Sequence, residues 1–158
     1  SGSIIAKITH TSSPLNKKTN RFVKLWEQDK KYTIEEFHNF AEKIRKKKNK
    51  LKKYLTELKK DGKITYAYGA PAKGNTLLNY FDIDKALIDR SVEINEMKIG
   101  NYLPASHIPI VRETKEDNPD YYLLLSHNFE EEIIKKNQDI INKGVKFIIP
   151  FPEIKIVP

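Results

Sequence analysis

The chain has 158 residues, a length that suits one domain or one domain with an appendage. It contains no cysteine, which excludes disulfides and cysteine-ligated zinc or iron–sulfur sites, and no run of 18 apolar residues that could span a membrane. The formal net charge of +8 is uneven, with +11 over residues 1–60 and −3 over residues 61–158. Without a secretion signal at its start, the sequence predicts a cytoplasmic protein with no membrane partner.

The first part of the chain predicts a short strand, an irregular segment and a long helix. "IIAKIT" (4–9) is typical of a strand, and residues 10–32 are polar. Thr33 and Glu36 form a capping-box pattern that begins a helix over 33–60, and Gly62 ends it. Its apolar residues follow a heptad spacing and comprise Ile34, Phe37, Ala41, Ile44, Leu51, Leu55 and Leu58.

After Gly62 the apolar pattern changes to short runs separated by helical segments. The predicted strands are 64–68, 85–89, 107–111, 121–125 and 145–151, and the predicted helices are 74–81 and 129–144. Continuous apolar strands that alternate with helices predict an α/β fold, with a mostly parallel sheet of about five strands and helices on its faces.

The loop after the first of these strands carries the main functional signal. Its candidate binding residues are Gly69, Ala70, Lys73, Gly74, Asn75 and Thr76. Gly69 permits a sharp turn, Gly74 is expected to open the helix whose free N–H groups favour an anion, and Lys73 adds a charge. The loop therefore predicts a phosphate site, although a strand–turn–helix corner that needs small residues explains the same pattern.

Three further candidates are expected at the ends of strands. Asp89 lies twenty residues after Gly69, where an acidic residue can bind a ribose diol, or it is a solvated partner of Arg90. His127 and Asn128 follow the strand 121–125 and could contact a ligand, although Ser126 or Asn128 as a helix cap explains that segment too. No spacing of His, Asp or Glu predicts a metal site, and no residue is predicted to be catalytic.

Four blocks, taken together, resemble a known family. They are "YGAPAKGNTLLNY" (68–80), "DRSVEINEMKIGNYLPASHIPI" (89–110), "PDYYLLLSHNFEEEI" (119–133) and "KFIIPFPE" (146–153). In this order they resemble the C-terminal domain of SAM-dependent C-methyltransferases that act on nucleotide-linked sugars. The chain departs from the family pattern in two places: His127 stands where Trp is usual, and Pro-Ala-Ser-His at 104–107 replaces Pro-Gly-Thr-His.

The resemblance implies a Rossmann-like domain over 62–158 that helps to bind the nucleotide-linked sugar. Residues 33–61 are then a connecting helix, and residues 1–32 are the end of a preceding SAM-binding methyltransferase domain and a linker. The chain itself would bind no cofactor, since S-adenosylmethionine belongs to that preceding domain of the full-length enzyme.

Two other functions fit parts of the sequence. One is a self-sufficient enzyme that binds NAD or another nucleotide at the same loop. The other is a basic-helix module for nucleic acid or a partner helix, which the few arginines make the less favoured reading, with four Arg against 25 Lys.

Overall fold

The structure is a computed structural model that describes residues 8–15, 17–29 and 32–158. The chain divides into two compact units, residues 1–44 and 45–158. Most of the strand predicted over 4–9 lies outside the described residues. The first unit contains α1 (Asn20–Asp29), a helix where the sequence predicted irregular chain. The Thr19 hydroxyl accepts a hydrogen bond from Phe22 N, which caps α1, and the rings of Phe22 and Trp26 stack one turn apart.

The predicted long helix is confirmed as α2 (Ile34–Lys60). The capping box forms as expected: Thr33 N donates to Glu36 Oε2 at 2.6 Å, and Glu36 N donates to Thr33 Oγ1 at 3.2 Å. Gly62 ends the helix with φ +72°, and Lys63 N bonds back to the Leu58 carbonyl. The heptad positions differ in burial, since Leu51, Leu55 and Leu58 are buried whereas Ile34 and Phe37 are exposed.

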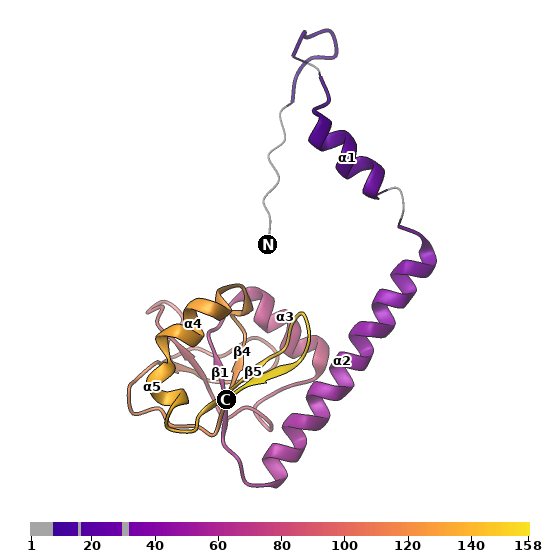
Figure 1. The fold of residues 1–158 in the computed structure, drawn as a ribbon. Helices are drawn as coiled ribbons and strands as arrows, with labels where there is room; N and C mark the ends of the chain where they lie inside the picture. The colour runs from indigo at the N-terminus through magenta and orange to yellow at the C-terminus, as the bar shows by residue number, and fades with distance from the viewer. Residues whose placement is uncertain (1–7, 16, 30–31) are drawn as a thin grey trace. The chain divides into compact units, whose positions relative to one another are not determined.

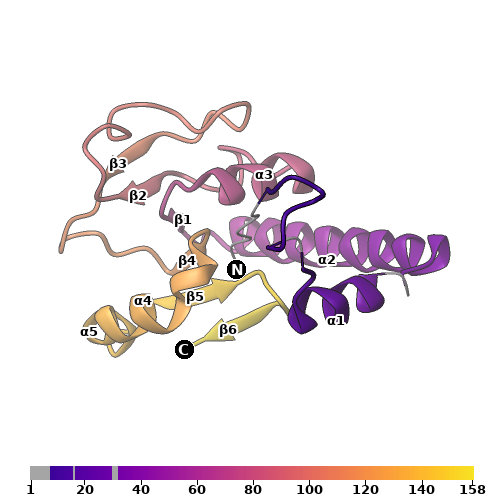
Figure 2. The same cartoon turned by 90° about the horizontal axis from the view of Figure 1, so that it is seen from above.

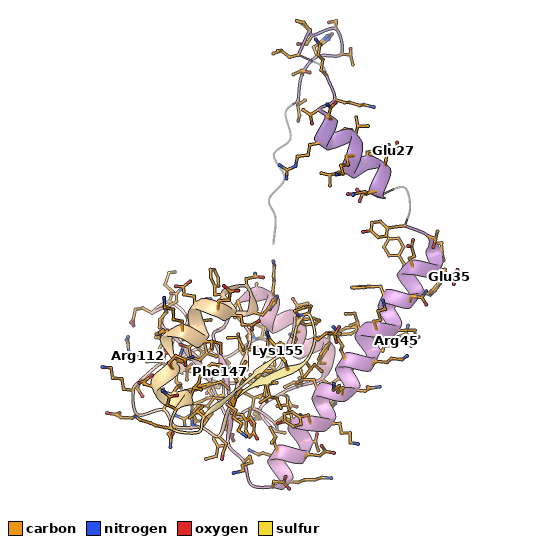
Figure 3. The ribbon with its side chains drawn as sticks, viewed as in Figure 1. Glu27, Glu35, Arg45, Arg112, Phe147 and Lys155 are labelled. Atoms are coloured by element: carbon orange, nitrogen blue, oxygen red, sulfur yellow. The ribbon has the colours of Figure 1, made fainter. Side chains whose placement is uncertain are left out.

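The second unit is built on a six-stranded, mostly parallel sheet, one strand more than predicted (Figure 1). Its strands are β1 (Thr65–Tyr68), β2 (Ser91–Glu93), β3 (Ile110–Arg112), β4 (Tyr121–Leu124), β5 (Lys146–Ile149) and β6 (Lys155–Val157). Their order is β3-β2-β1-β4-β5-β6, and only β6 runs antiparallel to its neighbour. Figure 3 shows Phe147 of β5 inside the unit and Arg112 of the edge strand β3 at its periphery.

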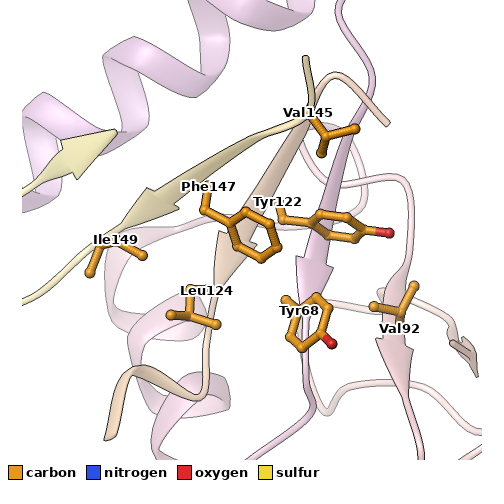
Figure 4. Close-up of a cluster of buried hydrophobic side chains, with 7 residues drawn as sticks. All are labelled: Tyr68, Val92, Tyr122, Leu124, Val145, Phe147 and Ile149. Carbon is orange, nitrogen blue, oxygen red and sulfur yellow. The ribbon is translucent and has the colours of Figure 1, made fainter. Parts of the chain in front are cut away.

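Helices cover both faces of this sheet, as predicted. Figure 2 shows α4 (Glu130–Lys136) and α5 (Gln138–Ile141) on one face, and α3 (Ala72–Phe81) with residues 45–60 of α2 on the other. Side chains alternate between the two faces along each strand. The rings of Tyr68, Tyr122 and Phe147 pack together under α4 and α5, with centroids 5.1–5.6 Å apart (Figure 4).

The strand predicted over 85–89 is wrong. This segment is a turn, in which the Asp84 carboxylate accepts a hydrogen bond from Ala86 N and the Asp84 carbonyl accepts from Leu87 N and Ile88 N. Ile88 is buried as a single anchor rather than as part of a strand. The second strand begins only at Ser91.

Other boundaries also shift. The helix predicted over 129–144 is divided into a 3₁₀ turn, η1 (His127–Phe129), followed by α4 and α5. The division between α4 and α5 falls at the buried Asn137, whose side-chain amide donates to the Ile133 carbonyl and to the Tyr68 hydroxyl. The strand predicted over 107–111 is β3, which begins at Ile110, and β6 was not predicted. None of the described helices is long and apolar enough to cross a membrane.

The two halves of the heptad stripe should respond differently to truncation. Leu55→Ala removes a side chain that is 1% exposed, and we expect it to lower the free energy of unfolding by about 2–5 kcal/mol. Ile34→Ala, at a position 75% exposed, should change it by less than about 0.5 kcal/mol. Urea titrations followed by circular dichroism would measure both, and equal losses would contradict the division of the stripe.

Candidate functional site

The candidate site lies at the carboxyl edge of the sheet, where the parallel strands end. β1 and β4 are neighbours there, but the chain leaves β1 for α3 on one face and leaves β4 for α4 on the other. This reversal is a topological switch point, the place where ligands bind in open parallel sheets. The segments after β1 and β4 supply all the predicted site residues except Asp89.

Residues 69–76, the glycine loop, are held rigidly where they leave β1. Gly69 has φ +84°, a conformation that favours glycine, and an added Cβ would lie 2.4 Å from Ser126 Oγ. Its N–H donates to the Val92 carbonyl at 2.8 Å, and its carbonyl accepts from the buried Ser91 hydroxyl at 2.9 Å. The predicted turn at Gly69 is therefore confirmed, and β2 fixes its position.

Glu93, which the sequence analysis missed, fixes the next residue of the loop. Its carboxylate accepts hydrogen bonds from the backbone N–H groups of Ala70 (3.0 Å), Ile94 (2.9 Å) and Asn95 (3.2 Å). Lys98 bridges the same pair, since its Nζ bonds to the Ala70 carbonyl and lies 3.5 Å from Glu93. Burial raises the pKa of Glu93, but the three N–H donors and the Lys98 charge outweigh it and hold the pKa below its ordinary value.

Helix α3 begins two residues before the predicted start, because Pro71 takes an extended conformation at the N-cap and Ala72 is already helical. The expectation that Gly74 opens the helix is therefore wrong. Gly74 is buried in the first turn, where an added Cβ would lie only 2.6 Å from Leu125 Cβ. Its role is to let α3 approach the end of β4, while Lys73 beside it is exposed.

Three of the predicted polar side chains have a buried atom without a hydrogen-bond partner, and Asp89 Oδ2 is one of them. Asn75 Oδ1 and His127 Nδ1 are buried and have no hydrogen-bond partner. Thr76 donates its hydroxyl to the Ala72 carbonyl at 3.2 Å, and Asn128 is exposed in η1. Neither Ser126 nor Asn128 forms a side-chain cap at η1 or α4, so capping does not explain this segment.

The predicted position of Asp89 at the end of a strand is wrong. Asp89 precedes β2, and its N–H bonds to the carbonyl of Thr65 at the start of β1, so it lies at the amino edge of the sheet. Its carboxylate pairs with Lys59 at 2.8 Å. The argument for a ribose contact depended on the carboxyl edge and so no longer applies to Asp89.

A second group of polar side chains was also missed because it is assembled from distant segments. The Tyr68 hydroxyl donates to Glu113 Oε1 at 2.5 Å, and Lys136 Nζ donates to both oxygens of Glu113 at 2.9 and 2.8 Å. Burial, followed by the Glu113 contact, raises the pKa of Tyr68. These side chains line one wall of a cavity of about 370 Å³ that opens at the carboxyl edge on the α4 face.

Within the part of the chain that the structure describes, no group of three His, Asp or Glu side chains could hold a metal ion. The lysines of α2 lie close to acidic side chains of the second unit. Lys47 pairs with Glu153 at 2.9 Å, Lys48 with Asp82 at 2.7 Å and Lys59 with Asp89 at 2.8 Å. Three lysines of the basic stretch of α2 are thus paired with acidic side chains within the second unit.

Comparison with known proteins identifies a family. Residues 1–152 match the family model described as the C-methyltransferase C-terminal domain. The chain is also 32% identical over 123 residues to C-methyltransferase NovU of Streptomyces niveus. This alignment covers 77% of the chain but only 29% of NovU, so the chain matches less than a third of that relative's length.

The close approach of α3 to β4 can be tested at two adjacent positions. Gly74→Ala places a Cβ against Leu125, and we expect overpacking to cost about 1–3 kcal/mol of the free energy of unfolding. Lys73→Ala, at the exposed neighbouring position, should change it by less than about 0.5 kcal/mol. Thermal and urea unfolding would measure both variants, and a neutral Gly74→Ala would show that α3 is not tightly placed.

Glu93 should make stability depend on pH. The pKa of Glu93 is lower in the folded chain than its ordinary value of about 4.3. Its contribution to the free energy of unfolding is therefore complete above that ordinary pKa and is lost as the pH falls through the lower pKa of the folded chain. We expect Glu93→Gln to be less stable at pH 7 and to lose less stability between pH 5 and 3 than the unchanged chain. Urea titrations at several pH values would show this, with the exposed Glu116→Gln as control; parallel curves would contradict it.

Proposed function

Because the chain belongs to the family of the C-methyltransferase C-terminal domain, we propose that it binds the nucleotide-linked sugar on which such an enzyme acts. The observation that carries the proposal is the N-terminus of α3, which opens at the switch point beside unpaired polar atoms. The strand order β3-β2-β1-β4-β5-β6 supports a Rossmann-like assignment, since doubly wound nucleotide-binding sheets use this order.

The first turn of α3 would hold the phosphates. The N–H groups of Ala72, Lys73 and Gly74 point out of the helix and have no acceptor within it. Together with the helix dipole they favour an anion, and the exposed Lys73 side chain adds a positive charge. Since Ser91, Glu93 and Lys98 already fix the loop, little ordering is needed when a ligand binds.

The unpaired atoms fit a sugar better than a second phosphate. Asn75 Oδ1 is a hydrogen-bond acceptor, whereas an ionised phosphate offers no donor, and His127 Nδ1 donates or accepts according to the tautomer, so that a hydroxyl suits it in either form. Sugar hydroxyls do offer donors. We therefore assign the phosphates to the backbone of α3 and the sugar hydroxyls to Asn75 and His127.

The chemistry of methyl transfer would belong to another part of the enzyme. We propose that S-adenosylmethionine and the catalytic residues are supplied by a methyltransferase domain, because the chain aligns with only 29% of NovU. The NAD-dependent alternative needs a free acidic side chain at the end of β2 to bind a ribose diol. Glu93 occupies that position, but its oxygens already accept three backbone hydrogen bonds, which disfavours that alternative.

Binding can be measured on the 158-residue chain. We expect UDP-, GDP- or dTDP-linked sugars to shift the amide resonances of residues 69–76 and 126–128 in NMR titrations. Lys73→Ala should weaken this binding about two- to fivefold, as for an exposed ion pair, and Lys60→Ala at the exposed end of α2 should not. As comparison ligands, NAD should bind more weakly than the matching nucleotide sugar, and S-adenosylmethionine, which has no phosphate, should not bind. No shifts at millimolar ligand, shifts confined to 33–60, or a preference for NAD would refute the proposal.

A further inference from the structure

The cavity on the α4 face has no role in the phosphate and sugar contacts described above. It lies at the same carboxyl edge, has a volume of about 370 Å³, and is bordered by the ends of β1, β2 and β4 and by α4. We propose that this cavity, which we call the α4 cleft, binds the nucleobase of the nucleotide. The proposal rests on the proposed function and adds to it the place and orientation of the ligand.

The walls of the α4 cleft suit a flat aromatic ring. Val92 and Ile133 provide apolar surface, and the side chains of Phe129 and Ile94 at its border are 60% and 70% exposed. An exposed aromatic ring beside a cavity is a stacking surface for a base, because every nucleobase has a π face. The volume lies at the lower end of the range for small-molecule sites.

The polar wall of the α4 cleft offers an acceptor and a donor side by side. The Glu113 carboxylate is 17% exposed, accepts from the Tyr68 hydroxyl and contacts the Lys136 ammonium, which is 56% exposed. A carboxylate beside an ammonium matches the adjacent N–H and C=O groups of a uracil, thymine or guanine ring. Adenine and cytosine lack this ring amide, so the pair favours the first three bases.

Charge sets the orientation of the ligand. Glu93, Glu113 and Glu132 line the α4 cleft together with Lys136, so the cleft carries excess negative charge and repels a phosphate. The N-terminus of α3 has the opposite character. Gly69 and Ser126 lie against each other, and both line the α4 cleft. Gly69 leads into the first turn of α3 and Ser126 leads into His127, so the α4 cleft is continuous with the region assigned to the phosphates and the sugar.

Phe129→Ala tests the nucleobase assignment with little risk to the fold, because the side chain is 60% exposed. We expect this variant to bind UDP, dTDP or GDP roughly 5- to 100-fold more weakly, the range found for loss of one base-stacking contact. Its affinity for pyrophosphate should be unchanged, and Phe129→Tyr should restore nucleotide binding. In NMR titrations the nucleotides should also shift residues 92–94 and 113, and pyrophosphate should not.

A comparison with Lys73→Ala separates this inference from the proposed function. Lys73→Ala should weaken the binding of nucleotides and of pyrophosphate to the same extent. If Phe129→Ala binds nucleotides as tightly as the unchanged chain while Lys73→Ala binds them more weakly, the phosphate site is supported and the nucleobase assignment is wrong. Equal affinity for ADP and UDP would also overturn the match to Glu113 and Lys136. Failure of every nucleotide and of pyrophosphate to bind would refute the proposed function itself.

Discussion

Leu125 occupies the space in which a side chain at position 74 would lie, since an added Cβ would be 2.6 Å from Leu125 Cβ. Because Gly74 has no side chain, the first turn of α3 can rest directly on the end of β4. This contact brings the segment after β1 next to the segment after β4, although fifty residues separate them in the sequence. The unpaired atoms of Asn75 and His127 belong to these two segments, so the arrangement of the site follows from one missing side chain.

The uneven charge of the sequence has its explanation in the second unit. Leu51, Leu55 and Leu58 are buried on one side of α2. Their burial provides most of the free energy that holds α2 on the second unit, because exposed ion pairs contribute only about 0–1 kcal/mol each. The pairs that Lys47, Lys48 and Lys59 make with acidic side chains outside α2 contribute mainly to the orientation of the helix. A basic segment that is complementary to an acidic domain does not require nucleic acid to explain its charge.

The features predicted correctly are those determined by local pattern. The capping box, the long helix, the apolar strands β1, β4 and β5 and the turn at Gly69 all have continuous signals. The second strand was misplaced because "KALID" is more apolar than "RSVEI", yet Asp84 closes the former into a turn and pairing with β1 selects the latter. Glu93, Glu113 and Lys136 could not be found by spacing, since each has a partner in a segment far from it in the sequence.

That misplaced strand also changes what the site can bind. With Asp89 at the carboxyl edge, the sequence suggested a dinucleotide-like ribose contact. With Glu93 there instead, the acidic side chain is used to hold Ala70, and its hydrogen bonds to three N–H groups leave it poorly suited to a diol. The nucleotide that we propose as the ligand would therefore be recognised by contacts other than this carboxylate. We propose that these contacts come from the first turn of α3 for a phosphate, from Asn75 and His127 for a sugar, and from the pair formed by Glu113 and Lys136 for a base.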